Sequence, residues 1–172
     1  MDDANADATS ELEPREPTLS DLVALCRELN ARGALYVVVG GFAVCSAGWF
    51  RKTMVIDLVI DISLENEARV YKALEILPDR AVLDLKPGEV GEYNVCRVAD
   101  EVTVDLMRSA CGSDYAEASR HVVVREVEGV PIPFASPLLL WRTKKPLGRE
   151  KDLPDLAFLR QSLESAGITP PE

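Results

Sequence analysis

Two aspartates lie inside apolar segments whose patterns predict β-strands. Asp57 interrupts the segment 55–61, and Asp105 interrupts the run VTVDLM in the same way. A carboxylate in such a strand is costly unless it is paired or coordinates a cation. We therefore expect Asp57 and Asp105 to face the same side of one sheet, close enough to share a single cation.

A second group of residues is suited to binding phosphate groups. The chain passes from the apolar run LYVVV through a glycine pair into a short helix, so the backbone can approach a phosphate closely there. A basic turn, RKT, precedes Asp57, and more basic residues lie where two C-terminal helices are expected to meet. The alternative is a plain strand-to-helix turn and solvent-exposed charges. The candidates are Gly40, Gly41, Arg51, Thr53, Lys144 and Arg149.

The elements that must position these residues follow from apolar periodicity and from turn residues. We expect helices at 18–30, 42–47, 63–77, 115–120, 138–145 and 149–166. We expect strands at 35–39, 55–61, 81–85, 90–98, 102–107, 121–127 and 130–134, with hairpin turns at 99–100 and 128–129. This order, in which α/β units precede a mixed sheet and closing helices, predicts an α+β domain. The fully apolar strand 35–39 predicts a central position in the sheet.

Length and composition predict one domain at 18–167, preceded by a disordered acidic arm at 1–17 and followed by a short tail at 168–172. No apolar run reaches the ~20 residues of a membrane helix. The N-terminus lacks the layout of a signal peptide. These features predict a cytoplasmic protein with no membrane association, and the four cysteines are interpreted as free thiols.

Charge and histidine content narrow the chemistry. The net charge of −10 argues against non-specific binding to DNA or RNA, which needs clustered Lys and Arg. It is compatible with a nucleotide bound in a local basic patch. His121 is the single histidine, which excludes a His-rich zinc site.

Taken in order, these motifs resemble the nucleotidyltransferase superfamily. The similarity is greatest to the small bacterial members grouped with minimal nucleotidyltransferases and abortive-infection toxins. It extends over about residues 20–165. The matching segments are GGFA at 40–43, RKT at 51–53, VID at 55–57, Asp105, and Lys144 with REKD at 149–152.

The resemblance implies a mixed twisted sheet flanked by helices, with the C-terminal helices closing a cleft. It implies Mg²⁺-dependent transfer of a nucleoside monophosphate from a nucleoside triphosphate (NTP) to a hydroxyl acceptor. Asp57 and Asp105 would then be the catalytic carboxylates and Mg²⁺ ligands, and the phosphate-binding candidates would hold the NTP. The acceptor stays open between a protein, a tRNA end and a small molecule. A partner protein and a toxin–antitoxin or phage-defence setting also follow from the resemblance.

Val55 departs from the family pattern, because it stands where the first acid of an acidic-x-acidic pair is expected. A valine cannot bind a metal. Asp61 does not replace that acid, since it lies about 13 Å past Asp57 along an extended strand. Two alternatives therefore stay open: a catalytically degenerate module that binds a nucleotide or a partner, and a purely structural interaction domain. A Rossmann domain is disfavoured because the glycines do not spell GxGxxG.

Overall fold

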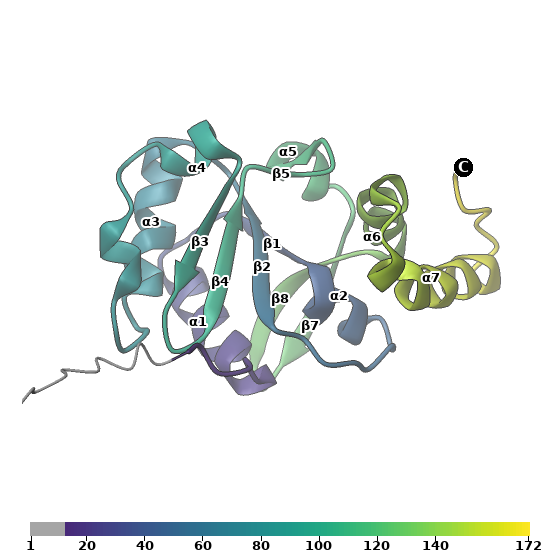
Figure 1. Ribbon diagram of the computed structural model, residues 1–172, viewed down its shortest axis with the longest axis horizontal. Helices are drawn as coiled ribbons and strands as arrows, with labels where there is room; N and C mark the ends of the chain where they lie inside the picture. Colours follow the sequence, from purple (N-terminus) through teal and green to yellow (C-terminus); the bar gives the residue numbers. More distant parts are fainter. Residues whose placement is uncertain (1–12) are drawn as a thin grey trace, which may run out of the picture.

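The computed structural model describes residues 13–172, which form a six-stranded mixed sheet with helices on both faces (Figure 1). The strand order is β3-β4-β2-β1-β8-β7. The β2–β4 and β1–β8 pairs are parallel, and the other neighbouring pairs are antiparallel. The strands are β1 (Tyr36–Val39), β2 (Val55–Ile60), β3 (Val95–Ala99), β4 (Thr103–Met107), β7 (Val122–Val127) and β8 (Val130–Ala135). The predicted central position of the run LYVVV is confirmed.

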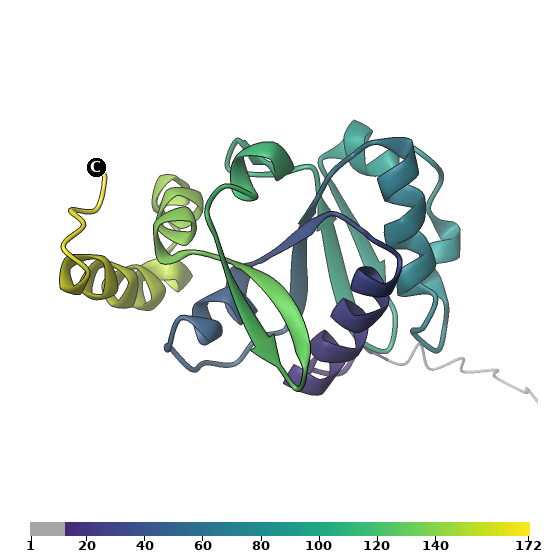
Figure 2. The same ribbon diagram turned by 180° about the vertical axis from the view of Figure 1, so that it is seen from behind.

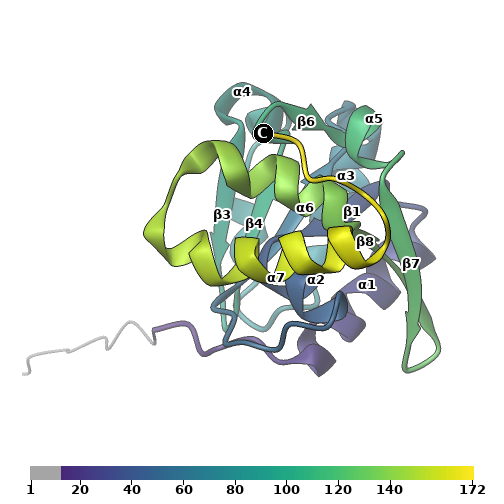
Figure 3. The same ribbon diagram turned by 90° about the vertical axis from the view of Figure 1, so that its right-hand side faces the viewer.

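Helices cover the two faces unequally. On one face lie α1 (Leu19–Ala31) and α3 (Leu64–Leu74), as Figure 2 shows from behind. On the other side lie α2 (Gly40–Ser46), α6 (Pro137–Lys144) and α7 (Leu153–Ser165); the last two project from the sheet (Figure 1) and lie in front of it when that side faces the viewer (Figure 3). The shorter elements are α4 (Glu89–Tyr93), α5 (Tyr115–Ala118), β5 (Ser109–Ala110) and β6 (Ser113–Asp114), with 3₁₀ turns at Lys145–Leu147 and Glu150–Asp152. The predicted α+β class is confirmed.

One predicted strand is wrong, and a second is wrong over its first half. Segment 81–85 is a 3₁₀ turn, Ala81–Asp84, and the first half of 90–98 belongs to α4. Tertiary hydrogen bonds decide both places. The Asp100 carboxylate accepts the backbone N–H groups of Asp79 and Ala81, and Glu67 accepts the N–H of Gly88 just before α4. Short apolar runs do not distinguish a strand from a helical turn without such partners.

Residues 13–17, which were predicted to belong to a disordered arm, contact the folded domain. Of that arm, residues 1–12 lie outside the described part. Within residues 13–17, the Arg15 N–H donates to the Glu101 carbonyl at 2.9 Å, the Arg15 guanidinium pairs with Asp21, and Pro17 is buried. The C-terminal tail also packs, because the Trp141 indole donates to the Pro171 carbonyl at 2.8 Å. Across residues 13–172, no helix has the length and apolarity required to cross a membrane.

Candidate functional site

A row of three charged residues crosses the sheet at the centre of the site. Asp57 on β2 is in register with Asp105 on β4, and Asp105 is in register with Arg97 on β3. Residues that pair directly on neighbouring strands point to the same face. The two aspartates therefore face one side together, as their sequence positions predicted. The Arg97 guanidinium binds Asp105 through both carboxylate oxygens, each at 2.9 Å.

Asp57 is the less satisfied of the two carboxylates. No described residue donates a hydrogen bond to it. Burial and the nearby Asp105 raise the pKa of Asp57 to about 7, and this outweighs the opposing effect of Lys144, Arg97 and Lys151. A half-buried carboxylate beside a second one is stabilised in its charged form by a bound cation.

The glycine pair is required by side chains of the chain itself. Gly40 has φ +67°, and a Cβ there would lie 2.2 Å from Oδ2 of Asp57. At Gly41 a Cβ would lie 2.6 Å from Oγ1 of Thr53 and 3.1 Å from Nη1 of Arg51. The sequence predicted that the glycines allow another group to come close to the backbone. In the structure, the groups that lie against the glycines are the side chains of predicted site residues.

A buried ion-pair network forms the wall opposite the sheet. Lys144, at the end of α6, lies 3.1 Å from Oδ1 of Asp152 and 3.3 Å from Oδ2 of Asp155. Arg51 donates two hydrogen bonds to the Asp155 carboxylate, at 2.7 and 2.8 Å, and Arg149 donates one to Asp152 at 2.6 Å. The network joins the loop before β2 to the C-terminal helices. Asp152 and Asp155 thus bind cations from three separate segments of the chain.

The row and the wall enclose a cleft of about 590 Å³. All eight predicted site residues line it: Gly40, Gly41, Arg51, Thr53, Asp57, Asp105, Lys144 and Arg149. Lys52 and Lys151, which belong to the RKT and REKD motifs, also line it, whereas sequence reasoning missed Arg97 and Met107. The described lining holds six basic and three acidic side chains, so the cleft concentrates positive charge in a chain whose net charge is −10.

The two carboxylates on the sheet, Asp57 and Asp105, are the candidate oxygen ligands for a cation in the cleft. Val55 lines the cleft two residues before Asp57, in register with Thr103, and contributes no oxygen ligand. Within residues 13–172, no cluster of three or more His, Cys, Asp or Glu side chains is placed to hold a metal ion. Asp61 lies outside the cleft and accepts the N–H of Ser63. Because Asp152 is already bound by Lys144 and Arg149, Asp57 and Asp105 are the lining carboxylates that could contribute oxygen ligands to Mg²⁺.

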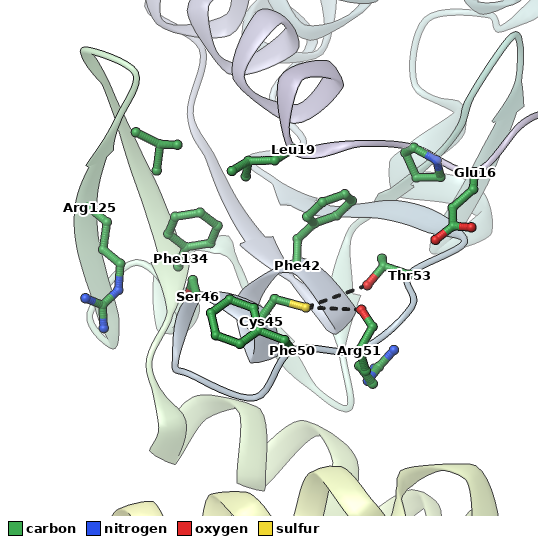
Figure 4. Close-up of a pocket in the computed structure, with 12 residues that line it drawn as sticks. Glu16, Leu19, Phe42, Cys45, Ser46, Phe50, Arg51, Thr53, Arg125 and Phe134 are labelled. Carbon is green, nitrogen blue, oxygen red and sulfur yellow. Dashed lines mark hydrogen bonds between the residues drawn. The ribbon is translucent and has the colours of Figure 1, made fainter.

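A smaller pocket of about 330 Å³ lies between α1, α2, the loop before β2, and the β7–β8 hairpin (Figure 4). Its lining is largely apolar, with Leu19, Phe42 and Phe134 on its walls. Arg51 and Thr53 line both this pocket and the charged cleft. The free thiol of Cys45 contacts the Arg51 carbonyl and the Thr53 hydroxyl, as the dashed lines in Figure 4 mark.

Comparison with solved structures identifies the fold. A lincomycin-bound lincosamide antibiotic adenylyltransferase, LnuA, superposes with a TM-score of 0.57 at 14% identity, over 86% of this chain and 99% of that one. A candidate nucleotidyltransferase from Thermotoga maritima matches with a TM-score of 0.47 at 15% identity, over 88% and 98%. No protein-family model and no curated protein matches the chain significantly. The chain has the nucleotidyltransferase fold.

Proposed function

We propose that the cleft binds an NTP together with one Mg²⁺ and transfers its nucleoside monophosphate to a hydroxyl acceptor, with pyrophosphate as the leaving group. The observation that carries this proposal is the register of Asp57 with Asp105 on adjacent parallel strands, inside a cleft lined by six basic side chains. Asp57 and Asp105 would hold the ion. When bound, Mg²⁺ would polarise a phosphoryl oxygen as a Lewis acid.

The basic residues divide into two groups by their partners. Arg51, Lys144 and Arg149 are held by Asp152 and Asp155, so they present a rigid and only weakly positive wall to the triphosphate. Lys52 and Lys151 are exposed at the same cleft, and Lys151 has no salt bridge to a described residue. We propose that these two lysines follow the phosphates as the nucleotide enters, while the wall orients them.

The acceptor is proposed to be a small molecule or a protein carrying a hydroxyl group. The net charge of −10 disfavours an unaided tRNA end. The superposable LnuA is an adenylyltransferase that binds lincomycin, which supports a small-molecule acceptor. A cytoplasmic location, where NTPs are available, and a toxin–antitoxin or phage-defence setting with a partner protein belong to the same proposal.

A second candidate function is nucleotide binding without transfer. Val55 favours it, because the first acid of the motif is replaced by an apolar side chain that lines the cleft. In that case the fold would act as a nucleotide-dependent binding module, and the acceptor would be replaced by a partner protein.

Calorimetry with ATP, GTP, CTP and UTP in Mg²⁺, followed by a transfer assay with α-phosphate-labelled NTP, separates the two functions. We expect saturable binding of at least one NTP, lost in Asp57→Ala. Labelled product supports transfer, and binding without product supports the second function. Failure of all four NTPs to bind would refute both.

Val55→Asp sharpens the same test. It adds a carboxylate two residues before Asp57, on the same strand face, and should strengthen Mg²⁺-dependent NTP binding by at most a few kcal/mol. Val124→Asp is the matched control, since Val124 is an exposed valine on β7 outside the cleft lining. If neither Val55→Asp nor Asp57→Ala alters binding, the proposed metal site is absent.

A further inference from the structure

We propose that the cleft takes a single divalent cation and that the Arg97 guanidinium supplies a further positive charge to the triphosphate. This inference rests on the proposed function and assigns a role that the fold alone does not give. It follows from the hydrogen bonds of Arg97, from its exposure and from the neighbours of the two aspartates.

The first argument is the number of oxygen ligands available. Nε of Arg97 bonds Oδ1 of Asp105, and Nη2 bonds Oδ2, both at 2.9 Å. Both oxygens of that carboxylate are therefore shared with a fixed cation. A second Mg²⁺ would need further oxygen ligands in near-octahedral geometry, and Val55, which lines the cleft two residues before Asp57, supplies none.

The second argument is the set of donors that Arg97 keeps free. A guanidinium carries five N–H donors, and a bidentate carboxylate contact uses two of them. Nη1 of Arg97 has no hydrogen-bond partner among residues 13–172. The Arg97 side chain is 62% exposed while the Asp105 carboxyl is 11% exposed, so the open edge of the guanidinium is accessible to a phosphate.

Arg51 is an example of an arginine whose guanidinium is fully bound by the protein. Its Nε and Nη2 bind Asp155, and its Nη1 donates to the Lys52 carbonyl, so each of its three nitrogens has a protein partner. Arg51 is a structural clamp that also lines the cleft. Arg97 has the same bidentate contact with an aspartate, but its Nη1 has no hydrogen-bond partner among the described residues.

A fixed guanidinium makes part of the phosphate binding independent of metal. Arginine stays protonated at every working pH, and its planar donors match two phosphate oxygens. We therefore expect the wild-type protein to retain measurable ATP binding in EDTA, weaker than in Mg²⁺.

Metal stoichiometry gives a test that needs no activity and no nucleotide. Mn²⁺ alone, titrated into the protein and followed by electron paramagnetic resonance, should occupy one site in the wild type. Arg97→Gln should keep one site and bind Mn²⁺ about tenfold more tightly, because Asp105 is released and a nearby positive charge is removed. The double variant Val55→Asp/Arg97→Gln should bind two ions. Two sites in the wild type, or none, would overturn the proposal.

ATP binding in EDTA tests the phosphate contact directly. Arg97→Gln should weaken it at least tenfold and Arg97→Lys less, while Arg125→Gln, an exposed arginine on β7 outside the cleft, should leave it unchanged. Circular dichroism confirms that the variants fold. An unchanged affinity in Arg97→Gln contradicts the role of Arg97. If wild-type protein binds no ATP even in Mg²⁺, the proposed function fails instead, and the Mn²⁺ stoichiometry still decides the number of metal sites.

Discussion

Two pairs of aspartates flank the cleft, and their surroundings are opposite in kind. Asp152 and Asp155, at the start of α7, are 2% and 1% exposed and share three cations, Arg51, Lys144 and Arg149. On the sheet, Asp105 is paired with Arg97, whereas Asp57 has no salt bridge to a described residue. One pair is neutralised by the protein, and the other retains unbalanced negative charge.

The difference separates the parts of the site that hold its shape from the part that is left for a ligand. Breaking a buried, fully paired network leaves uncompensated charges. We therefore expect substitutions in the wall to lower the free energy of unfolding. Removing an unpaired carboxylate relieves repulsion and desolvation. We therefore expect substitution of Asp57 to weaken ligand binding and to raise the free energy of unfolding.

The largest effect is expected from Asp155→Ala. It strips a partner from both Arg51 and Lys144 and should lower the free energy of unfolding by about 3–5 kcal/mol. Urea unfolding at neutral pH measures this loss. Glu164→Ala on the same helix is the control, because its 3.8 Å pair with Arg160 lies at the surface and should contribute less than about 1 kcal/mol. A similar loss in both variants would contradict the distinction drawn for the wall.

Gly40→Ala should come next. Alanine at φ +67° costs about 1–2 kcal/mol, and the clash with Asp57 adds roughly 1–3 kcal/mol of overpacking. Gly33→Ala isolates the backbone part, since Gly33 has φ +65° and nothing within 4 Å of the added Cβ. The two variants, compared by thermal and urea unfolding, should differ by the clash alone. Equal losses would mean that Asp57 moves aside freely.

Asp57→Asn should stabilise the metal-free protein at pH 8. The pKa of Asp57 is raised to about 7 in the folded state, from about 3.9 in the unfolded state. Between these values the folded state binds the extra proton, so wild-type stability falls as pH rises through that window. Because the group is partly exposed, we expect roughly 1–3 kcal/mol. Unfolding in EDTA from pH 4 to pH 8 should show a smaller decline in the variant, and parallel curves would refute the raised pKa.

The smallest expected effect is the stabilisation of the wild type by Mg²⁺. A single site at ten times its dissociation constant adds about 1.4 kcal/mol. Differential scanning fluorimetry should show a rise in Tm for the wild type and none for Asp57→Asn. Asp152→Asn gives a sharper comparison, because a carboxylate already held by two cations should not bind the ion. If Asp152→Asn also abolishes the Mg²⁺ response, the ion belongs to the wall.

The sequence alone was sufficient for the elements that carry strong local signals. The helix expected at 18–30 is α1, and the apolar run at 35–39 becomes the central strand β1. Asp57 and Asp105 could be found because a carboxylate in an apolar strand is costly without a partner. The segments mistaken for strands, 81–85 and the first half of 90–98, had no such local signal, and carboxylates distant in the sequence bind the backbone there.

Only the tertiary structure decided which charges meet. A two-residue turn at 99–100 would place Arg97 opposite Val102, whereas the wider turn of the structure places it opposite Asp105. The contact of Arg51 with Asp155 joins residues that are 104 positions apart. Local patterns report burial and periodicity, which depend on neighbours along the chain. The pairing of charges depends on strand register and on how the closing helices dock, which single-residue patterns do not encode.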